Sequence, residues 1–211
     1  MNQLIIGIAG YAGVGKDFLA SALEKELSEL SYKTEIEHFA KTLKKECWEF
    51  CVEKFGIDPV SCSREEKEII RDFLVGYAKS KRKLSNGAYW VKTLEKRVEI
   101  SKSEVILIAD VRHAAYAFDE CQWIRNKKNG IVIHVSRFSA DENGERKFVG
   151  PANSEEKEND LLVKSFADYS FCWKDFTDDS SYKPHVKNLV QWLISNKKIN
   201  VDGKSIILNE S

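Results

Sequence analysis

GYAGVGKDF, residues Gly10 to Phe18, follows directly on the apolar run LIIGIA at residues 4–9. Such a run is typical of a strand buried on both faces, and apolar residues at helical spacing follow the glycines. Gly10, four further residues and Gly15-Lys16 match the front of the pattern GxxxxGK[ST], whose glycines let successive backbone N–H groups turn toward phosphate oxygens. The stretch therefore predicts strand, phosphate-binding turn and helix, the opening unit of a parallel α/β fold.

The turn and the first helical residues are the predicted ATP site. Lys16 supplies an ammonium group between the outer phosphates, and the helix N-terminus adds a positive dipole end. Asp17 stands where the pattern has Ser or Thr; a carboxylate there can ligate Mg²⁺, but it can equally cap the helix, and both readings stay open. The predicted ATP-binding residues are Gly10, Tyr11, Ala12, Gly13, Val14, Gly15, Lys16 and Asp17.

Overall charge offers no reason to expect a nucleic-acid or membrane partner. The 211 residues contain 33 Lys plus Arg and 33 Asp plus Glu, so any anion must be held by a local cluster. The basic run KSKRK, residues 79–83, is interpreted as a solvated helix end, because no stacking aromatics are interleaved with it. Five cysteines without a CxxC pair predict reduced thiols. Without a signal-peptide pattern or an apolar run of membrane-spanning length, we expect a cytoplasmic protein.

The whole chain, residues 1–211, is predicted to be one three-layer α/β domain with a parallel five-stranded sheet. A helix closed by Gly56, a capping box at Ser63 and Glu66, and a helix closed by Gly130 are among its expected elements. The predicted parts are a core (1–40, 102–137 and 158–196), a helical acceptor-binding insertion (41–101), a mobile polar lid (138–157) and a C-terminal hairpin tail at Asp202-Gly203 (197–211). For the tail, an edge strand and a homodimer contact both remain open.

Asp110 ends the apolar strand EVILIAD, residues 104–110. The carboxyl edge of a parallel sheet is where ligands bind in open α/β folds, so this acid lies where a ligand is expected. Arg112 follows two residues later, and phosphoryl transfer needs several such cations converging on two phosphate groups.

Taken in order, GYAGVGKD, FAKTLKK, RDFLVGYA…YW, ADVRH and NSEEKEND resemble the bacteriophage-type deoxynucleoside monophosphate kinases, P-loop kinases distantly related to dephospho-CoA kinase. The resemblance runs through most of residues 4–175. It implies ATP- and Mg²⁺-dependent phosphorylation of a deoxynucleoside monophosphate, with a mobile lid. Two departures, FAKTLKK in place of an Asp-Pro segment and Phe18 in place of a hydroxyl residue, bear on the base accepted more than on phosphate transfer.

The resemblance also implies individual roles. Lys16, Arg112, Arg137 and Arg146 would be catalytic, with the last two in or beside the lid. Asp17 and Asp110 would serve the metal. The acceptor would be bound by Lys41, Arg71, Trp90, Arg112 and Glu155, although Trp90 can also be read as a core residue. Two other functions stay open: another small-molecule kinase such as dephospho-CoA kinase, and a nucleotide-binding regulator without an acceptor.

Overall fold

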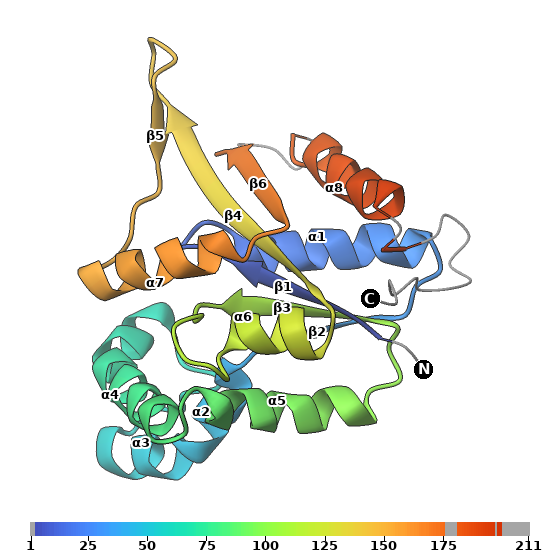
Figure 1. The fold of residues 1–211 in the computed structure, drawn as a ribbon. Coiled ribbons are helices and arrows are strands. Elements are labelled where there is room, and N and C mark those ends of the chain that lie inside the picture. Colours follow the sequence, from blue (N-terminus) through green and yellow to red (C-terminus); the bar gives the residue numbers. More distant parts are fainter. Residues whose placement is uncertain (1–2, 176–180, 197, 200–211) are drawn as a thin grey trace.

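A central sheet of five parallel strands, in the order β2-β3-β1-β4-β6, organises the chain. The computed structural model describes residues 3–175, 181–196 and 198–199. Helices cover both faces of the sheet, so the predicted three-layer α/β fold is confirmed (Figure 1). The parallel strands are β1 (Leu4–Ala9), β2 (Thr34–Glu37), β3 (Val105–Val111), β4 (Ile131–Ala140) and β6 (Tyr169–Lys174).

The two faces of β1 feed two separate hydrophobic cores. Leu4, Ile6 and Ile8 pack with α1 (Lys16–Glu29) and α8 (Lys183–Ser195). Ile5 and Ala9 pack on the other side with α5 (Ala88–Ile100), the short α6 (Glu120–Gln122) and the π-helical turn η1 (Trp123–Lys127). Burial on both faces explains why this strand is a continuous apolar run rather than an alternating one.

Residues 41–101 are helical as predicted, but the first helix is divided. The pattern ending at Gly56 forms α2 (Ala40–Glu46) and α3 (Trp48–Phe55), which meet at Cys47. Cys47 is buried with Cys51 in a small cluster between these helices and α4 (Arg64–Leu84), so the break keeps the thiol side of the segment packed inward. The predicted capping box of Ser63 and Glu66 begins α4.

The helix predicted to end at Gly130 begins later than its composition indicates. Residues 112–119 form a loop, and α6 starts at Glu120. Asp119, just before α6, is bonded within the loop. It accepts the Tyr116 N–H and forms two hydrogen bonds with Arg82, of 2.8 and 2.7 Å. A buried ion pair therefore overrides local helix propensity here.

The segment predicted to be an irregular lid is partly regular. Strand β4 continues past Arg137 to Ala140 and pairs with the antiparallel β5 (Arg146–Phe148), and α7 (Ser154–Ser165) begins before residue 157. The aromatic pair Phe138 and Phe148, with centroids 5.5 Å apart, stabilises the hairpin. At Phe138, β4 pairs with β5 on one side and with β6 on the other, so β5 lies on the same side of β4 as β1 does at residues 131–134. The hairpin projects from the body of the protein (Figure 1).

Other sequence predictions have mixed outcomes. All five cysteines are free, and burial raises the pKa of the Cys47 thiol to about 11. No helix in the described part of the chain combines the length and the apolar character needed to cross a bilayer. The hairpin predicted at Asp202-Gly203 lies outside the described residues.

Candidate functional site

The phosphate loop, residues 10–17, joins the carboxyl end of β1 to α1. Gly10, Gly13 and Gly15 have φ angles of +134°, +81° and +90°, in the region that favours glycine. A Cβ at Gly10 would lie 2.3 Å from the carbonyl oxygen of Val135, so this position also tolerates no side chain. These conformations form the turn that the glycine spacing predicts, with the N-terminus of α1 beside it.

Trp173 of β6 packs against the phosphate loop, and it is not among the residues predicted from the sequence. Its indole Nε1–H donates to the carbonyl oxygen of Val14 at 2.9 Å, and the residue is 1% exposed. A Cβ on Gly15 would come within 2.6 Å of the indole ring. The contact joins residues 159 positions apart in the chain, so no local sequence pattern predicts it. The loop is therefore braced by the sheet as well as by its own glycines.

Lys16 is buried against the loop that it follows. Its Nζ donates to the carbonyl oxygens of Gly10 and Tyr11, both at 2.8 Å, and the residue is 7% exposed. Burial, with a smaller contribution from the charge of Arg112, lowers the pKa of Lys16 to about 8. A phosphate group bound in the loop would raise the pKa of Lys16 toward its ordinary value and so favour the ammonium form, which suits the role predicted for this side chain.

Asp17 and Asp110 both lie near His38. The Nε2 of His38 is 2.9 Å from Asp17 Oδ1, and this hydrogen bond lowers the pKa of the Asp17 carboxyl. Asp110 accepts the N–H groups of Phe39 and Ala40, at 2.8 and 2.9 Å, at the start of α2, while burial raises its pKa. Mg²⁺ held mainly by substrate phosphates and water needs only one or two carboxylates, so this pair fits such an ion.

The acid that reaches the phosphate loop is Glu156, one residue beyond the predicted Glu155. Glu156 Oε1 accepts the backbone N–H of Ala12 at 2.9 Å and lies 3.8 Å from Arg112 Nη1. Glu155 instead pairs with Lys79 of α4 at 3.0 Å. The helix start at Asn153 places acids near the loop, but only the direction of each side chain decides which one enters it.

Of the four predicted arginines, Arg112 lies 3.8 Å from Glu156, the acid that contacts the phosphate loop, and its charge acts on Lys16. The backbone N–H of Arg112 donates to the buried carboxyl of Glu120 at 2.6 Å, which fixes the start of the loop after β3. Burial raises the pKa of Glu120 to about 8. Arg112 therefore has a fixed backbone and a side chain directed toward Lys16 and Glu156.

The other three arginines are held by neighbours away from this contact. Arg71 pairs with Glu68 on its own helix, although the charge of Glu156 still reaches it. Arg137 Nε lies 2.9 Å from Asp175, and the Arg146 guanidinium lies 4.7 Å above the Phe138 ring on the hairpin. Their predicted roles need a movement of the hairpin or of α4.

Trp90 and Lys41, both predicted acceptor contacts, are placed differently. Trp90, in the first turn of α5, is 6% exposed, and its Nε1–H donates to the carbonyl oxygen of Ala78 of α4 at 3.0 Å. The structure therefore supports the core reading of Trp90. Lys41 is exposed and pairs with Glu37, the last residue of β2, at 3.1 Å.

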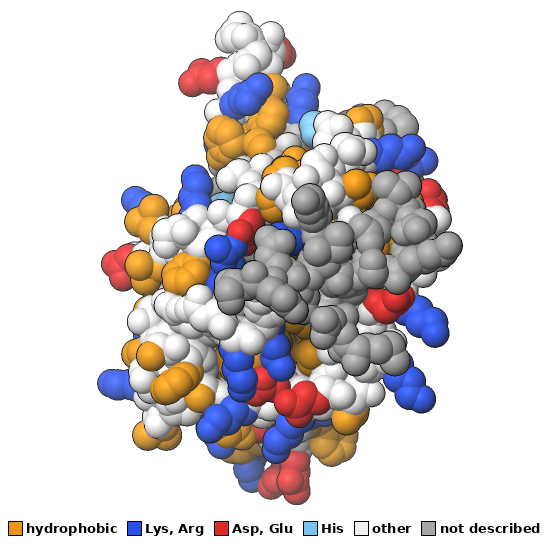
Figure 2. Space-filling view, turned by 45° about the vertical axis from the view of Figure 1, so that its right-hand side comes forward, with side chains coloured by type: hydrophobic (Ala, Val, Ile, Leu, Met, Phe, Trp, Pro, Cys, Tyr) orange, Lys and Arg blue, Asp and Glu red, His pale blue; other side chains and the backbone are white. Residues whose placement is uncertain are grey.

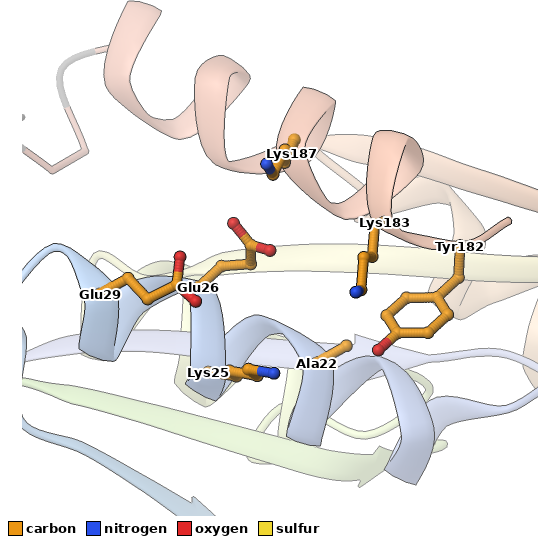
Figure 3. A pocket seen from close by; sticks show the side chains of 7 residues that line it. All are labelled: Ala22, Lys25, Glu26, Glu29, Tyr182, Lys183 and Lys187. Atoms are coloured by element: carbon orange, nitrogen blue, oxygen red, sulfur yellow. The ribbon is translucent and has the colours of Figure 1, made fainter. Parts of the chain in front are cut away.

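A shallow pocket between α1 and α8 offers no comparable chemistry. Lys25, Glu26 and Glu29 of α1 face Lys183 and Lys187 of α8 across it, so its charges are of both signs (Figure 3). Acidic and basic side chains are also interspersed over the face shown in Figure 2. The phosphate loop, which takes no part in this pocket, remains the candidate site.

Comparison with known proteins adds little beyond the fold. No family model matches the chain, and no curated protein matches it. A shikimate kinase from Aquifex aeolicus is 16% identical with a TM-score of 0.45, over 92% of this chain and 98% of that one. A shikimate kinase from Acinetobacter baumannii in complex with shikimate is 13% identical with a TM-score of 0.42, over 92% and 95%.

An APS kinase from Mycobacterium tuberculosis is 13% identical with a TM-score of 0.41, over 91% of this chain and 97% of that one. At these values the similarity carries no conclusion about substrate or mechanism. Those questions rest on the geometry of the site.

Proposed function

We propose that this protein is a P-loop kinase that transfers the γ-phosphate of ATP to a nucleoside monophosphate, and that this acceptor is a deoxynucleoside monophosphate. The observation that carries the proposal is the glycine-lined loop with Lys16 buried against it and with the charge of Arg112 acting on Lys16. The order of motifs that resembles the bacteriophage-type kinases selects the acceptor class. The geometry alone supports phosphoryl transfer without naming the acceptor.

The donor side of the reaction is assigned to the phosphate loop. Backbone N–H groups of residues 10–17 and the N-terminus of α1 bind the β- and γ-phosphates, and Lys16 neutralises charge between them. Asp17 and Asp110 would hold Mg²⁺, which would offset the negative charge of the phosphates. Gly15 packed on Trp173 keeps the loop from relaxing, so the donors are in position before ATP arrives.

The acceptor side is assigned to the arginines that face the loop. Arg112, which lies 3.8 Å from Glu156, would contact the monophosphate, and Arg71 of α4 would join it after leaving Glu68. An ionised phosphate acceptor needs no general base. His113 fits this reading, because burial lowers its pKa to about 4 and leaves a neutral imidazole rather than a titrating base near pH 7. A regulator without an acceptor would have no use for this second group of cations.

An acceptor panel tests the proposal. Purified protein with ATP and MgCl₂ is incubated with each deoxynucleoside and ribonucleoside monophosphate and with dephospho-CoA, and products are separated by ion-exchange chromatography. We expect a diphosphate from at least one nucleoside monophosphate, and no product from the Lys16→Ala variant. Phosphorylation of dephospho-CoA but of no nucleotide would show that the acceptor is dephospho-CoA rather than a nucleoside monophosphate. ATP hydrolysis without any phosphorylated product would favour a nucleotide-binding regulator.

A further inference from the structure

Glu156 places a negative charge where the phosphate loop would meet its ligand. It is the third residue of α7, and its side chain is 16% exposed. Oε1 accepts the N–H of Ala12 at 2.9 Å, and Oε2 accepts the N–H of Ala152 at 2.6 Å. One carboxylate therefore joins the phosphate loop to the segment that follows the β4–β5 hairpin.

The groups around this carboxylate are mostly cationic. Arg112 Nη1 lies 3.8 Å away, and the charge of Glu156 acts on Lys16 and on Arg71. Cations gathered for a phosphate repel one another when no anion is present. A single carboxylate among them offsets part of that repulsion, and it accepts one backbone N–H of the loop in the same way as a phosphate oxygen.

We propose that Glu156 is a built-in anion that occupies the phosphate loop in the nucleotide-free protein and that a phosphate group must displace. This inference rests on the proposed function, because it assigns the competing ligand to the same loop. Displacement frees the Ala12 N–H and Arg112 together. It also breaks the connection that Glu156 makes between the phosphate loop and Ala152. Phosphate binding is therefore coupled to the position of the segment that follows the β4–β5 hairpin.

The construction of α7 allows the carboxylate to leave without unfolding the helix. The side chain of Asn153 caps the helix independently, accepting the Glu156 backbone N–H at 2.8 Å. Glutamine is an accepted substitute for glutamate at the third helical position, since its amide oxygen still accepts an N–H group. Glu156→Gln therefore removes the charge while keeping the shape of the helix start.

Calorimetric titration with inorganic pyrophosphate and MgCl₂ tests the inference without requiring turnover. The variants are Glu156→Gln, Lys16→Ala and, as a matched control, Glu158→Gln, which removes the same charge from an exposed position two residues along α7. We expect Glu156→Gln to bind pyrophosphate roughly fivefold tighter or more than the unmodified protein, because charge-assisted bonds no longer compete. Glu158→Gln should stay within about twofold, because an exposed charge is screened by solvent and salt.

Two outcomes separate the inference from the function beneath it. Binding that depends on Lys16 but is equal in Glu156→Gln and Glu158→Gln, or weaker in Glu156→Gln, overturns the role of Glu156 and leaves the phosphate loop standing. If neither the unmodified protein nor Glu156→Gln binds pyrophosphate, the loop is not a phosphate site, and the inference about Glu156 is wrong as well.

Discussion

The phosphate loop and the arginines that face it are built in opposite ways. In the loop, Lys16 is 7% exposed, and Gly15 lies against the indole of Trp173. On the facing side, the side chains of Arg71 and Arg112 are 46% and 49% exposed. Backbone conformation and the sheet hold the first region, whereas exchangeable ion pairs hold the second.

This difference indicates that the two halves of the site contribute at different times. A loop whose backbone is fixed before binding costs little backbone reorganisation when a triphosphate arrives, even though Glu156 must leave the Ala12 N–H. Arginines that are paired with Glu68, Glu156 or Asp175 must exchange partners before they can contact an acceptor phosphate. Substitutions in the loop should therefore affect every step, whereas substitutions on the facing side should affect mainly the acceptor.

The largest effect is expected at Lys16. Lys16→Ala removes the cation between the transferred phosphates, and we expect kcat to fall at least about a hundredfold. The thermal midpoint should change little, because the cores on both sides of β1 do not depend on the lysine head group. Turnover close to that of the unmodified protein would show that the loop is not the donor site.

Two glycines separate the strain of the loop from its contact with Trp173. Gly13→Ala and Gly15→Ala both place a side chain at positive φ, but only Gly15 has an atom within reach of the new Cβ. We expect Gly13→Ala to lower the free energy of unfolding by about 1 kcal/mol and Gly15→Ala by about 2 kcal/mol, measured by urea denaturation. Equal losses would mean that the indole does not brace the loop.

On the facing side, Arg112 should be distinguishable from Arg146. Arg112→Ala should raise the KM for the acceptor about tenfold with a smaller effect on the KM for ATP, because it removes one charged hydrogen-bonding partner of the acceptor phosphate. Arg146→Ala, on the projecting hairpin, should change that KM less than about threefold. Steady-state kinetics with each substrate varied in turn measures both. The reverse order would place the acceptor at the hairpin.

The smallest effect is expected at Asp17. Asp17→Asn keeps an oxygen in place but removes its charge, and the Mg²⁺ concentration for half-maximal rate should rise about threefold or more if the carboxylate serves the metal. Magnesium titration of the initial rate measures this. An unchanged titration would limit Asp17 to its bond with His38 and to its negative charge in the first turn of α1, where Gly15 is the N-cap residue and no side chain caps the helix.

The parts that could be predicted from sequence are those that local chemistry determines. Burial on both faces makes β1 and β3 continuous apolar runs, and the glycine spacing specifies the turn between β1 and α1. The late start of α6 depends on the pair of Asp119 with Arg82, which is 37 residues distant, and the hairpin depends on the packing of Phe138 on Phe148. Long-range partners of this kind leave no periodic signal.

The same limit applies within the site. The resemblance singled out Glu155, but the sequence could not show that Glu156 rather than Glu155 enters the loop, because neighbouring side chains on a helix point about 100° apart. Nor could it connect Trp173 to Gly15. Arg112 was found because it follows a strand that ends at the ligand-binding edge of the sheet.

A crystal structure with a non-hydrolysable ATP analogue and MgCl₂ tests the central claim most directly. The account predicts the β- and γ-phosphates within hydrogen-bonding distance of the backbone N–H groups of residues 13–17 and of Lys16 Nζ, with Glu156 displaced from Ala12. A nucleotide bound elsewhere, with Glu156 still on the loop and Lys16 still bonded to Gly10 and Tyr11, would contradict it.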